Sequence, residues 1–400
     1  MSKNFYITLF LAISIITSCS KNVSDTDNNN TGNPVNQNQD STKSLFVVTA
    51  ADSTTTIKSY NSSFNPLWSK QLQGSYLGYN YSDGSFYVTT ERFDYVTYKG
   101  TYFFYCLNAT NGSVKWSVNG TDKMYTPVFI GTKIYCNGYT SNGGSNIITF
   151  NANNGTVISK YFLGTQYGTA FMQSDSSSLY FLYVTQNTDY KVASYSTITN
   201  NITWSQSIGI RFDNSIPRPV LFKDKVAIQT NAGTLECYDK KTGSVSWTVN
   251  GSNFNQAMAG QDNVCSMSQS NGYYGYDNQT GQQKWFNAIT KNLHIPSLPF
   301  LPGENIFFAG KDATNWALYS ISAGTGTLNY KKDIRDELKK ITAVGSDLYG
   351  VYDDNTATNL GYILMLLSSD KGIAKDSIKV ACERLNFGIV TSADKFVTYQ

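Results

Sequence analysis

Apolar and polar residues alternate along most of the chain in short runs that are separated by turn-forming residues. From about residue 76 to residue 380, these runs can be divided into groups of four. One group consists of residues 218–222, 225–229, 234–238 and 245–249. Alternation with a period of two is typical of half-buried strands, so each group predicts a unit of four β-strands.

The last two runs of this group are joined by a tight turn. Asp239 opens the turn, where its carboxylate can accept hydrogen bonds from the backbone N–H groups just ahead. Gly243 stands where a hairpin of this length needs a left-handed residue, and Trp247 follows early in the returning strand. One such hairpin buries too little surface to be stable alone, so neighbouring units must cover it.

The same hairpin returns along the chain at intervals of 38 to 47 residues. The residues at the anchor position, which Asp239 occupies, are Asn61, Asn108, Asn151, Ser196, Asp277, Ser322 and Ser368 in the other copies. The glycines equivalent to Gly243 are Gly112, Gly155, Gly281, Gly326 and Gly372, and Asn200 replaces the glycine in the fourth copy. Five of the six tryptophans fall at one position of the repeat, namely Trp68, Trp116, Trp204, Trp247 and Trp285. Chance would scatter them, so the chain is built from repeats.

A period of this length with four strands per unit predicts an all-β fold, a closed β-propeller of eight four-stranded blades, with seven as the alternative. The first unit lacks an inner strand, because residues 45–48, 55–60 and 67–70 supply only three. Residues 387–390 and 396–399 provide that strand and one more. The N- and C-termini are therefore expected to share one blade, which closes the ring and removes exposed sheet edges. Residues 45–48 and 396–399 both suit the second position of this blade.

The hairpin resembles the repeat of the pyrroloquinoline-quinone-like propeller family, with its motif Asp-x-x-Thr-Gly-x-x-x-Trp. Residues 239–247 and 277–285 match the motif fully, whereas residues 108–116 carry Asn in place of Asp and Asn111 in place of Thr. The resemblance covers nearly the whole chain after residue 44 and implies a quinoprotein-type propeller. The architecture is also similar to that of the propeller lipoprotein subunit of the outer-membrane barrel assembly machinery. The repeat occurs in dehydrogenases and assembly factors alike, so it implies a fold rather than an activity.

Residues 1–19 are expected to be a lipoprotein signal peptide. Lys3 is followed by an apolar run at residues 5–17, which is too short to span a bilayer. Residues 16–19, Ile-Thr-Ser-Cys, resemble a bacterial lipobox and make Cys19 the expected lipidation site; an ordinary secretory signal with a chance cysteine is the alternative. Residues 20–44 are polar and predict a flexible linker, which leaves residues 45–400 for the propeller. The protein is therefore expected to be an exported lipoprotein of the outer membrane, on its periplasmic face or at the cell surface.

Composition agrees with a β-rich fold. The chain has 29 tyrosines and 22 phenylalanines, and charged residues make up only 15%. The formal charge is +3 without any basic run, which argues against nucleic-acid binding. The best helix signal is at residues 333–340, where Ile334, Leu338 and Ile341 share a face, and it predicts a turn or two of helix between blades.

Five cysteines remain after Cys19: Cys106, Cys136, Cys237, Cys265 and Cys382. Aligning the repeats places Cys136 one residue out of register with Cys265, so these two side chains should point to opposite faces. A common disulfide pattern is not expected, and the odd number leaves at least one thiol free. We expect these cysteines to be small buried fillers rather than redox or metal-binding groups.

Catalytic motifs are absent from the sequence. The only histidine, His294, lies in a proline-rich run and is expected to be a loop residue rather than a base. Residues 353–355, Asp-Asp-Asn, predict a solvated loop with weak potential for binding a cation. The dehydrogenases of the resembling family carry a vicinal disulfide over their cofactor, and no two cysteines are adjacent here. We therefore expect no catalytic residue, cofactor or metal site.

Two functional hypotheses follow. The first is a non-enzymatic, lipid-anchored scaffold of the cell envelope that binds a protein partner at its loops or strand edges. The alternative is a propeller that binds a surface glycan or small ligand through tyrosine, asparagine and glutamine side chains. Exposed aromatic residues at one mouth of the channel would favour a glycan, whereas an apolar strip along the rim would favour a protein. An enzyme with a site in the channel is a third hypothesis, which would require convergent carboxylates.

Overall fold

The computed structural model describes residues 42–398 with short gaps. The gaps are residues 52, 141–142, 165–171, 186–188, 209–217, 231–232, 252–253, 261, 269–270, 291–292, 294–300, 302–303, 345–346, 354–360, 382–383 and 392–395. The expected signal peptide with Cys19 and most of the expected linker lie outside the described residues, as do His294 and Cys382. Among the described residues, no helix has the length and apolarity that crossing a membrane requires.

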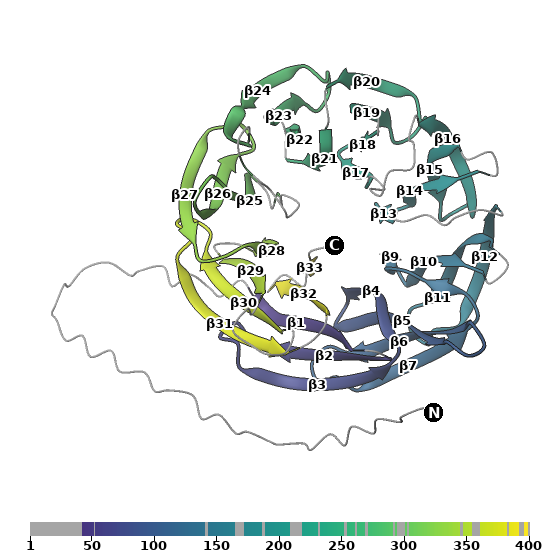
Figure 1. The fold of residues 1–400 in the computed structure, drawn as a ribbon. Coiled ribbons are helices and arrows are strands. Elements are labelled where there is room, and N and C mark those ends of the chain that lie inside the picture. The colour runs from purple at the N-terminus through teal and green to yellow at the C-terminus, as the bar shows by residue number, and fades with distance from the viewer. Residues whose placement is uncertain are drawn as a thin grey trace, which may run out of the picture. The chain divides into compact units, whose positions relative to one another are not determined.

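The described strands form eight antiparallel sheets around a common centre, and each sheet is one blade of a β-propeller (Figure 1). The all-β propeller with eight blades is therefore confirmed, and the alternative of seven blades is wrong. In blades 2 to 8, the chain runs from the innermost described strand to the strand at the circumference. Blade 7 has three described strands, because residues 294–300 and 302–303 just before it are not described.

The blades have the following strands. Blade 1 contains β3 (Pro66–Gln73), β2 (Thr54–Tyr60), β1 (Thr42–Ala51), β32 (Arg384–Thr391) and β33 (Phe396–Thr398). Blade 2 contains β4 (Ser75–Ser82), β5 (Ser85–Asp94), β6 (Lys99–Asn108) and β7 (Val114–Gly120). Blade 3 contains β8 (Lys123–Met124), β9 (Val128–Ile130), β10 (Lys133–Tyr139), β11 (Ser145–Asn151) and β12 (Val157–Gly164). Blade 4 contains β13 (Met172–Ser174), β14 (Ser178–Val184), β15 (Tyr190–Ser196) and β16 (Asn201–Ile208).

The second half of the ring repeats this order. Blade 5 contains β17 (Val220–Phe222), β18 (Lys225–Gln229), β19 (Thr234–Asp239) and β20 (Val245–Asn250). Blade 6 contains β21 (Phe254–Ala259), β22 (Asn263–Ser268), β23 (Gly272–Asp277) and β24 (Gln283–Asn287), followed by the short 3-10 turn η1 (Ala288–Thr290). Blade 7 contains β25 (Asn305–Lys311), β26 (Trp316–Ser322) and β27 (Leu328–Ile334). Blade 8 contains β28 (Leu338–Val344), β29 (Asp347–Asp353), β30 (Gly361–Ser368) and β31 (Ala374–Ala381).

Blade 1 is assembled from both ends of the chain. β1 pairs with β2 on one side and antiparallel with β32 on the other, so that Phe46 lies opposite Gly388. β33 then pairs with β32 as a fifth strand toward the centre of the ring (Figure 1). The prediction that both chain ends share one blade is confirmed. Both candidate strands belong to this blade: β1 occupies the second position, and β33 is an additional strand at the inner edge.

The inner strand of blade 3 is split into β8 and β9. Both pair with β10, β8 near Gly138 and β9 near Tyr135. Pro127 stands between them and has no N–H to donate to the sheet, which accounts for the break in pairing.

The hydrophobic core is divided among the seams between successive blades. In the seam between blades 1 and 2, Phe46 and Ile57 of blade 1 pack against Phe86 and Leu107 of blade 2. The rings of Phe46 and Phe86 stack with their centroids 4.7 Å apart. Because each sheet buries both faces in this way, its middle strands are apolar on both sides.

The expected helical turn at residues 333–340 is wrong. Ile334 ends β27, two bend residues follow, and Leu338 begins β28. Ile334, Leu338 and Ile341 belong to one hydrophobic cluster, as a helix face would require, but they reach it from two strands of neighbouring blades.

Candidate interaction surfaces

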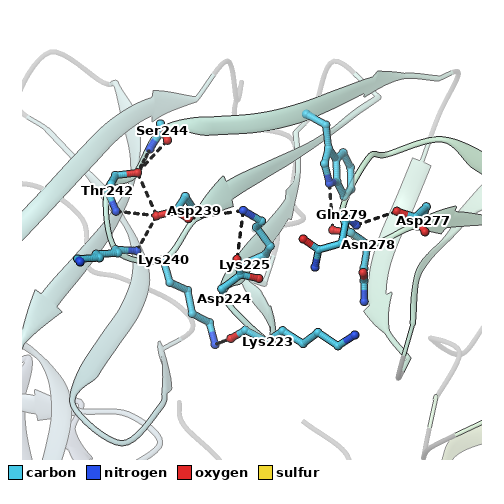
Figure 2. A network of polar contacts seen from close by, with 12 residues as sticks. Lys223, Asp224, Lys225, Asp239, Lys240, Thr242, Ser244, Asp277, Asn278 and Gln279 are labelled. Carbon is cyan, nitrogen blue, oxygen red and sulfur yellow. Dashed lines mark hydrogen bonds and ion pairs between the residues drawn. The ribbon is translucent and has the colours of Figure 1, made fainter.

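The repeated turn is held by its anchor side chain. The carboxylate of Asp239 accepts hydrogen bonds from the backbone N–H groups of Lys241 and Thr242 at 3.0 and 2.9 Å (Figure 2). The Thr242 hydroxyl donates to the same oxygen at 3.0 Å, and the N–H of Gly243 donates to the Asp239 carbonyl at 2.9 Å. These hydrogen bonds, led by the one from the Thr242 backbone, hold the pKa of Asp239 below its ordinary value. These hydrogen bonds all lie within the hairpin itself and involve no residue of a neighbouring blade.

Each tryptophan of the repeat joins its own blade to the turn of the next blade. The indole N–H of Trp247 in blade 5 donates to the carbonyl oxygen of Asn278 in blade 6 at 3.2 Å. The same ring lies so close to Gly281 that a Cβ there would be 2.7 Å from indole Cδ2. Glycine is therefore favoured at this position for two reasons: its φ is +70°, and a side chain would collide with the indole ring.

Four other seams have the same arrangement. Trp68 lies on Gly112, Trp116 on Gly155, Trp204 on Gly243 and Trp285 on Gly326. Their indole N–H groups donate to the carbonyl oxygens of Ala109, Ala152, Lys240 and Ala323 at 2.8 to 2.9 Å. The structure therefore brings the repeat tryptophans and glycines together as pairs across blades, a pairing that the sequence argument did not specify. These residues form the frame of the ring rather than a binding site.

Two of the remaining seams are closed differently. Between blades 3 and 4 the hydroxyl of Tyr161 donates to the side-chain oxygen of Asn201 at 3.0 Å, and its ring meets Tyr195 edge-on. Between blades 8 and 1, Phe64 occupies a turn position with a φ of +57° and is buried. The Phe64 ring meets Tyr349 of blade 8 edge to face at 6.4 Å. In this seam the aromatic ring belongs to the turn itself, whereas in the tryptophan seams the ring comes from the preceding blade and packs on the turn.

The seam between blades 7 and 8 holds Tyr330 at the tryptophan position. A groove of about 440 Å³ runs along this seam. Its residues come from β27 and the bend after it, from the end of β29, from positions along β30, from the turn at Gly372 and from β31. They are Lys332, Asp333, Ile334, Arg335, Asp336, Tyr352, Asp353, Ile363, Met365, Leu367, Gly372, Ala374, Ser377 and Lys379. The groove has an apolar floor and charged sides, and sequence reasoning did not anticipate it.

Two further hollows are more polar. One of about 300 Å³ lies among the inner strands β4, β9 and β13, and Asn80, Thr126 and Gln173 line it. The other, of about 480 Å³, follows the seam between blades 1 and 2 and contains Phe103 and Tyr105.

Exposed apolar side chains gather on the strands at the circumference. The large exposed hydrophobic residues of these outer strands are Leu67, Val114, Val157, Ile158, Phe162, Val245, Phe286 and Leu328. Val114, Val157, Val245 and Leu328 occupy one position of the repeat, six residues after the anchor. These residues place exposed apolar side chains on the outer strands of several blades, at the rim where the sequence analysis associated apolar surface with a protein partner.

The hairpin between β5 and β6 adds a second exposed surface. At its tip, Tyr95, Val96 and Tyr98 are 80%, 89% and 79% exposed. The tip is nevertheless ordered, because the Asp94 carboxylate accepts hydrogen bonds from the Val96 N–H at 2.8 Å and the Thr97 hydroxyl at 2.7 Å. A signal for this hairpin exists in the sequence, since the longest repeat interval, 47 residues, separates Asn61 from Asn108.

The described cysteine and carboxylate side chains form no cluster suited to a metal ion. Groups of three or more histidine, cysteine, aspartate or glutamate side chains suited to a metal are absent from the part of the chain that the structure describes. Cys106, Cys136, Cys237 and Cys265 are free and buried, as expected for small fillers, and burial raises the pKa of the Cys237 and Cys265 thiols to about 12. Asp353 pairs with Lys339 at 3.3 Å.

The charged groups between blades 5 and 6 form a surface network. Lys225 lies 3.4 Å from Asp224 and 3.5 Å from Asp239, and the Lys240 ammonium donates to the Lys223 carbonyl at 2.7 Å (Figure 2). Lys223 in turn reaches Asp262 of blade 6 at 3.1 Å. Apart from the Lys240–Lys223 hydrogen bond, these contacts pair opposite charges, and exposed ion pairs of this kind contribute little to stability.

The geometry defines an eight-bladed β-propeller in which tryptophan–glycine pairs of a repeated hairpin close five of the seams. The profile of the family described as outer membrane protein assembly factor BamB matches residues 41–249 and 143–372. The chain belongs to this family, and the resemblance to pyrroloquinoline-quinone-like propellers is confirmed.

Solved structures support the fold. The chain is similar to BamB from Moraxella catarrhalis, with 15% identity and a TM-score of 0.55 over 83% of this chain and 95% of that one. It is also similar to the C-terminal WD40 domain of Sif2 (13% identity, TM-score 0.54, 78% and 90% covered) and to a europium-containing methanol dehydrogenase (8% identity, TM-score 0.52, 78% and 80% covered). No curated protein sequence matches the chain. At these identities the similarity establishes the fold alone.

Proposed function

We propose that the protein is a non-enzymatic scaffold of the bacterial envelope, lipid-anchored through Cys19, that binds protein partners on its outer surface. The observation that supports this proposal best is the distribution of exposed apolar side chains, which lie on the rim strands and at the tip of the β5–β6 hairpin. A rigid ring with such a rim can hold a partner by side-chain packing without changing its own conformation. Membership of the family described as an outer membrane assembly factor supports a role in envelope assembly and an outer-membrane location.

The hairpin offers the sharpest test. Tyr95→Ser with Tyr98→Ser removes two aromatic side chains that are about four-fifths exposed, so stability should change by less than about 0.5 kcal/mol. Affinity capture of the intact protein from its native envelope should then recover less of its partners. Ile198→Ser is the matched control, because Ile198 is also 80% exposed but lies on the turn between β15 and β16 of blade 4. Equal recovery by the wild type and the double variant would argue against docking at the hairpin.

Glycan binding is the second candidate. Tyr95 lies edge-on to Phe93 at 5.1 Å, and exposed aromatic faces of this kind can stack on sugar rings. A glycan-array screen of the same variants separates the two proposals. Glycan binding that is lost with Tyr95 and Tyr98, together with unchanged protein capture, would favour the glycan.

A further inference from the structure

We propose that the groove between blades 7 and 8 is a docking site for an aromatic side chain with a carboxylate next to it, supplied by a partner protein. The inference deepens the proposed scaffold function and rests on it. It names one site on the ring and the chemistry of the group that would occupy it.

The shape of the site follows from comparison of the seams within this one chain. Five seams are filled by an indole that lies on a turn glycine and donates a hydrogen bond to the next blade. In the seam between blades 7 and 8, the turn glycine Gly372 is retained, with a φ of +63°. The aromatic residue facing it is Tyr330, whose Cε2 would lie 3.3 Å from a Gly372 Cβ. The nearest atoms to that position are Leu318 Cδ2 at 3.1 Å and Lys332 Cβ at 3.2 Å. Indole atoms come within 2.4 to 2.7 Å of that position in the other five seams, so this glycine is less tightly covered.

Tyr330 also fails to replace the indole hydrogen bond. Its hydroxyl is buried and has no hydrogen-bond partner among the described residues. Burial raises the pKa of Tyr330, so the hydroxyl stays protonated. The seam therefore keeps the glycine of the tryptophan pair but lacks the indole, and the groove lies beside that glycine.

The floor of the groove is suited to an apolar ring. Ile363, Met365 and Leu367 alternate along β30, so they point to the same side of the sheet. Ile334 of β27 faces them across the seam, and all four belong to the hydrophobic cluster between blades 7 and 8. Methionine adapts its shape and makes favourable contacts with aromatic rings, which suits a site that accepts a ring from outside.

The charges on the sides favour an anion beside the ring. Lys332 of β27 and Arg335 of the following bend make no ion pair with any described residue, and Lys379 of β31 lies on the opposite side.

The carboxylates along the groove do not offset these positive charges, because two of them have other partners and one points away from the groove. Asp353 is paired with Lys339, and Asp336 accepts a hydrogen bond from the Glu337 N–H at 2.8 Å. Asp333 alternates with Lys332 along β27 and so points to the other face of the strand. Lys332 and Arg335, above an apolar floor, are complementary to an aromatic group that carries a negative charge.

The test measures binding of N-acetyl-L-tryptophan and of its uncharged amide to the full-length protein by saturation-transfer NMR. We expect the acid to bind and the amide to bind more weakly. Lys332→Gln should weaken binding of the acid by about two- to five-fold and leave the amide unchanged, because an exposed charge contributes little more than that. Lys99→Gln, next to the tip of the β5–β6 hairpin in blade 2, is the matched control and should change neither probe.

The decisive variant is Tyr330→Trp. It restores the indole at this seam, so the protein should block its own groove and lose binding of both probes, whereas Tyr330→Phe should retain binding. Unchanged probe binding by Tyr330→Trp in folded protein, or equal effects of Lys332→Gln on the acid and the amide, would overturn the inference. Since partner capture at the hairpin is measured separately, failure here leaves the proposed scaffold function standing.

Discussion

Single residues set the spacing between blades, and the turn glycines do so most strictly. Gly243 has a φ of +70°, and a Cβ on it would meet Trp204 Cδ2 at 2.5 Å. Both the backbone conformation and the contact with the ring oppose any side chain there. Gly84 has a similar φ of +65°, but nothing lies within 4 Å of its Cβ position. Substitutions at Gly84 report backbone strain alone, whereas substitutions at Gly243 report backbone strain together with the steric clash with Trp204.

We predict that Gly243→Ala destabilises the protein more than Gly84→Ala does. Gly84→Ala should cost about 1 kcal/mol from the left-handed backbone alone. Gly243→Ala should cost roughly 1–3 kcal/mol more, because the Trp204 ring must move. Urea denaturation of both variants measures the difference, and equal losses would mean that the indole does not constrain this turn.

The anchor carboxylates predict how stability depends on pH. The side chain of Lys284 and the backbone N–H groups of Thr280 and Gln279 hold the pKa of Asp277 far below its ordinary value. A carboxylate whose pKa is lower in the folded state stabilises the fold above its unfolded pKa of about 4, and this contribution is lost as the pH falls further.

We therefore expect the melting temperature to fall below about pH 4, and Asp277→Asn to flatten that fall. The variant should be less stable than the wild type at pH 7, and the difference should shrink toward pH 2. Asp370→Asn, in the turn of blade 8 whose anchor is Ser368, serves as the control. A parallel acid profile for the wild type and Asp277→Asn would contradict the assigned role.

At the scale of strands and hairpins, the tryptophans of five outer strands each contact two blades at once. Trp247 is buried in the cluster between blades 5 and 6. Its removal deletes a large ring, a hydrogen bond to Asn278 and the cover over Gly281.

We predict that Trp247→Ala lowers the free energy of unfolding by about 3–5 kcal/mol, as for a buried large-to-small change. Trp316→Ala is the comparison, because Trp316 starts β26 outside the repeat position and is only partly buried under Lys311. Its loss should be smaller in the same denaturation experiment. A melting temperature unchanged by Trp247→Ala would show that this ring does not hold the seam.

Strands and turns were predictable from the sequence because they follow from local patterns. Alternation marked the strands, and the spacing of Asp239, Gly243 and Trp247 marked the hairpin. The helix expected near Ile334 and Leu338 failed because a spacing of four residues also arises when two strands end and begin at one seam. Phe64 in the seam between blades 8 and 1 escaped prediction for a related reason, since it packs against a residue 285 positions away, Tyr349.

The groove beside Gly372 was beyond the reach of the sequence for a physical reason. We infer that it results from the smaller size of a phenol ring compared with an indole, a difference that becomes visible only when the seams are compared in space. The tyrosine at position 330 could be noted from the repeat, but whether neighbours fill the space that it leaves depends on contacts between blades. The exposed tip at Tyr95 and Tyr98 could have been suspected from the long repeat interval.

At the scale of the whole molecule, the expected lipid anchor remains a proposal. We predict that Cys19→Ala moves the protein from the membrane fraction to the soluble fraction, because the acyl chains at this position would supply most of its membrane affinity. Fractionation of cells that express either form measures this. Ser20→Ala, which keeps the cysteine, is the control, and retention of Cys19→Ala in membranes would refute the anchor.

The pairing of β1 with β32 determines when the ring can be completed. β1 ends at Ala51 and β32 begins at Arg384, so the strands of blades 2 to 8 are synthesised before the partner of β1. Until then, β1 has an unpaired edge, the kind of edge that recruits strands from other chains. A chain that leaves the ribosome or a secretion channel amino end first must protect this edge throughout its passage. Premature stop codons in the final blade would therefore yield an aggregating product rather than a shortened working ring.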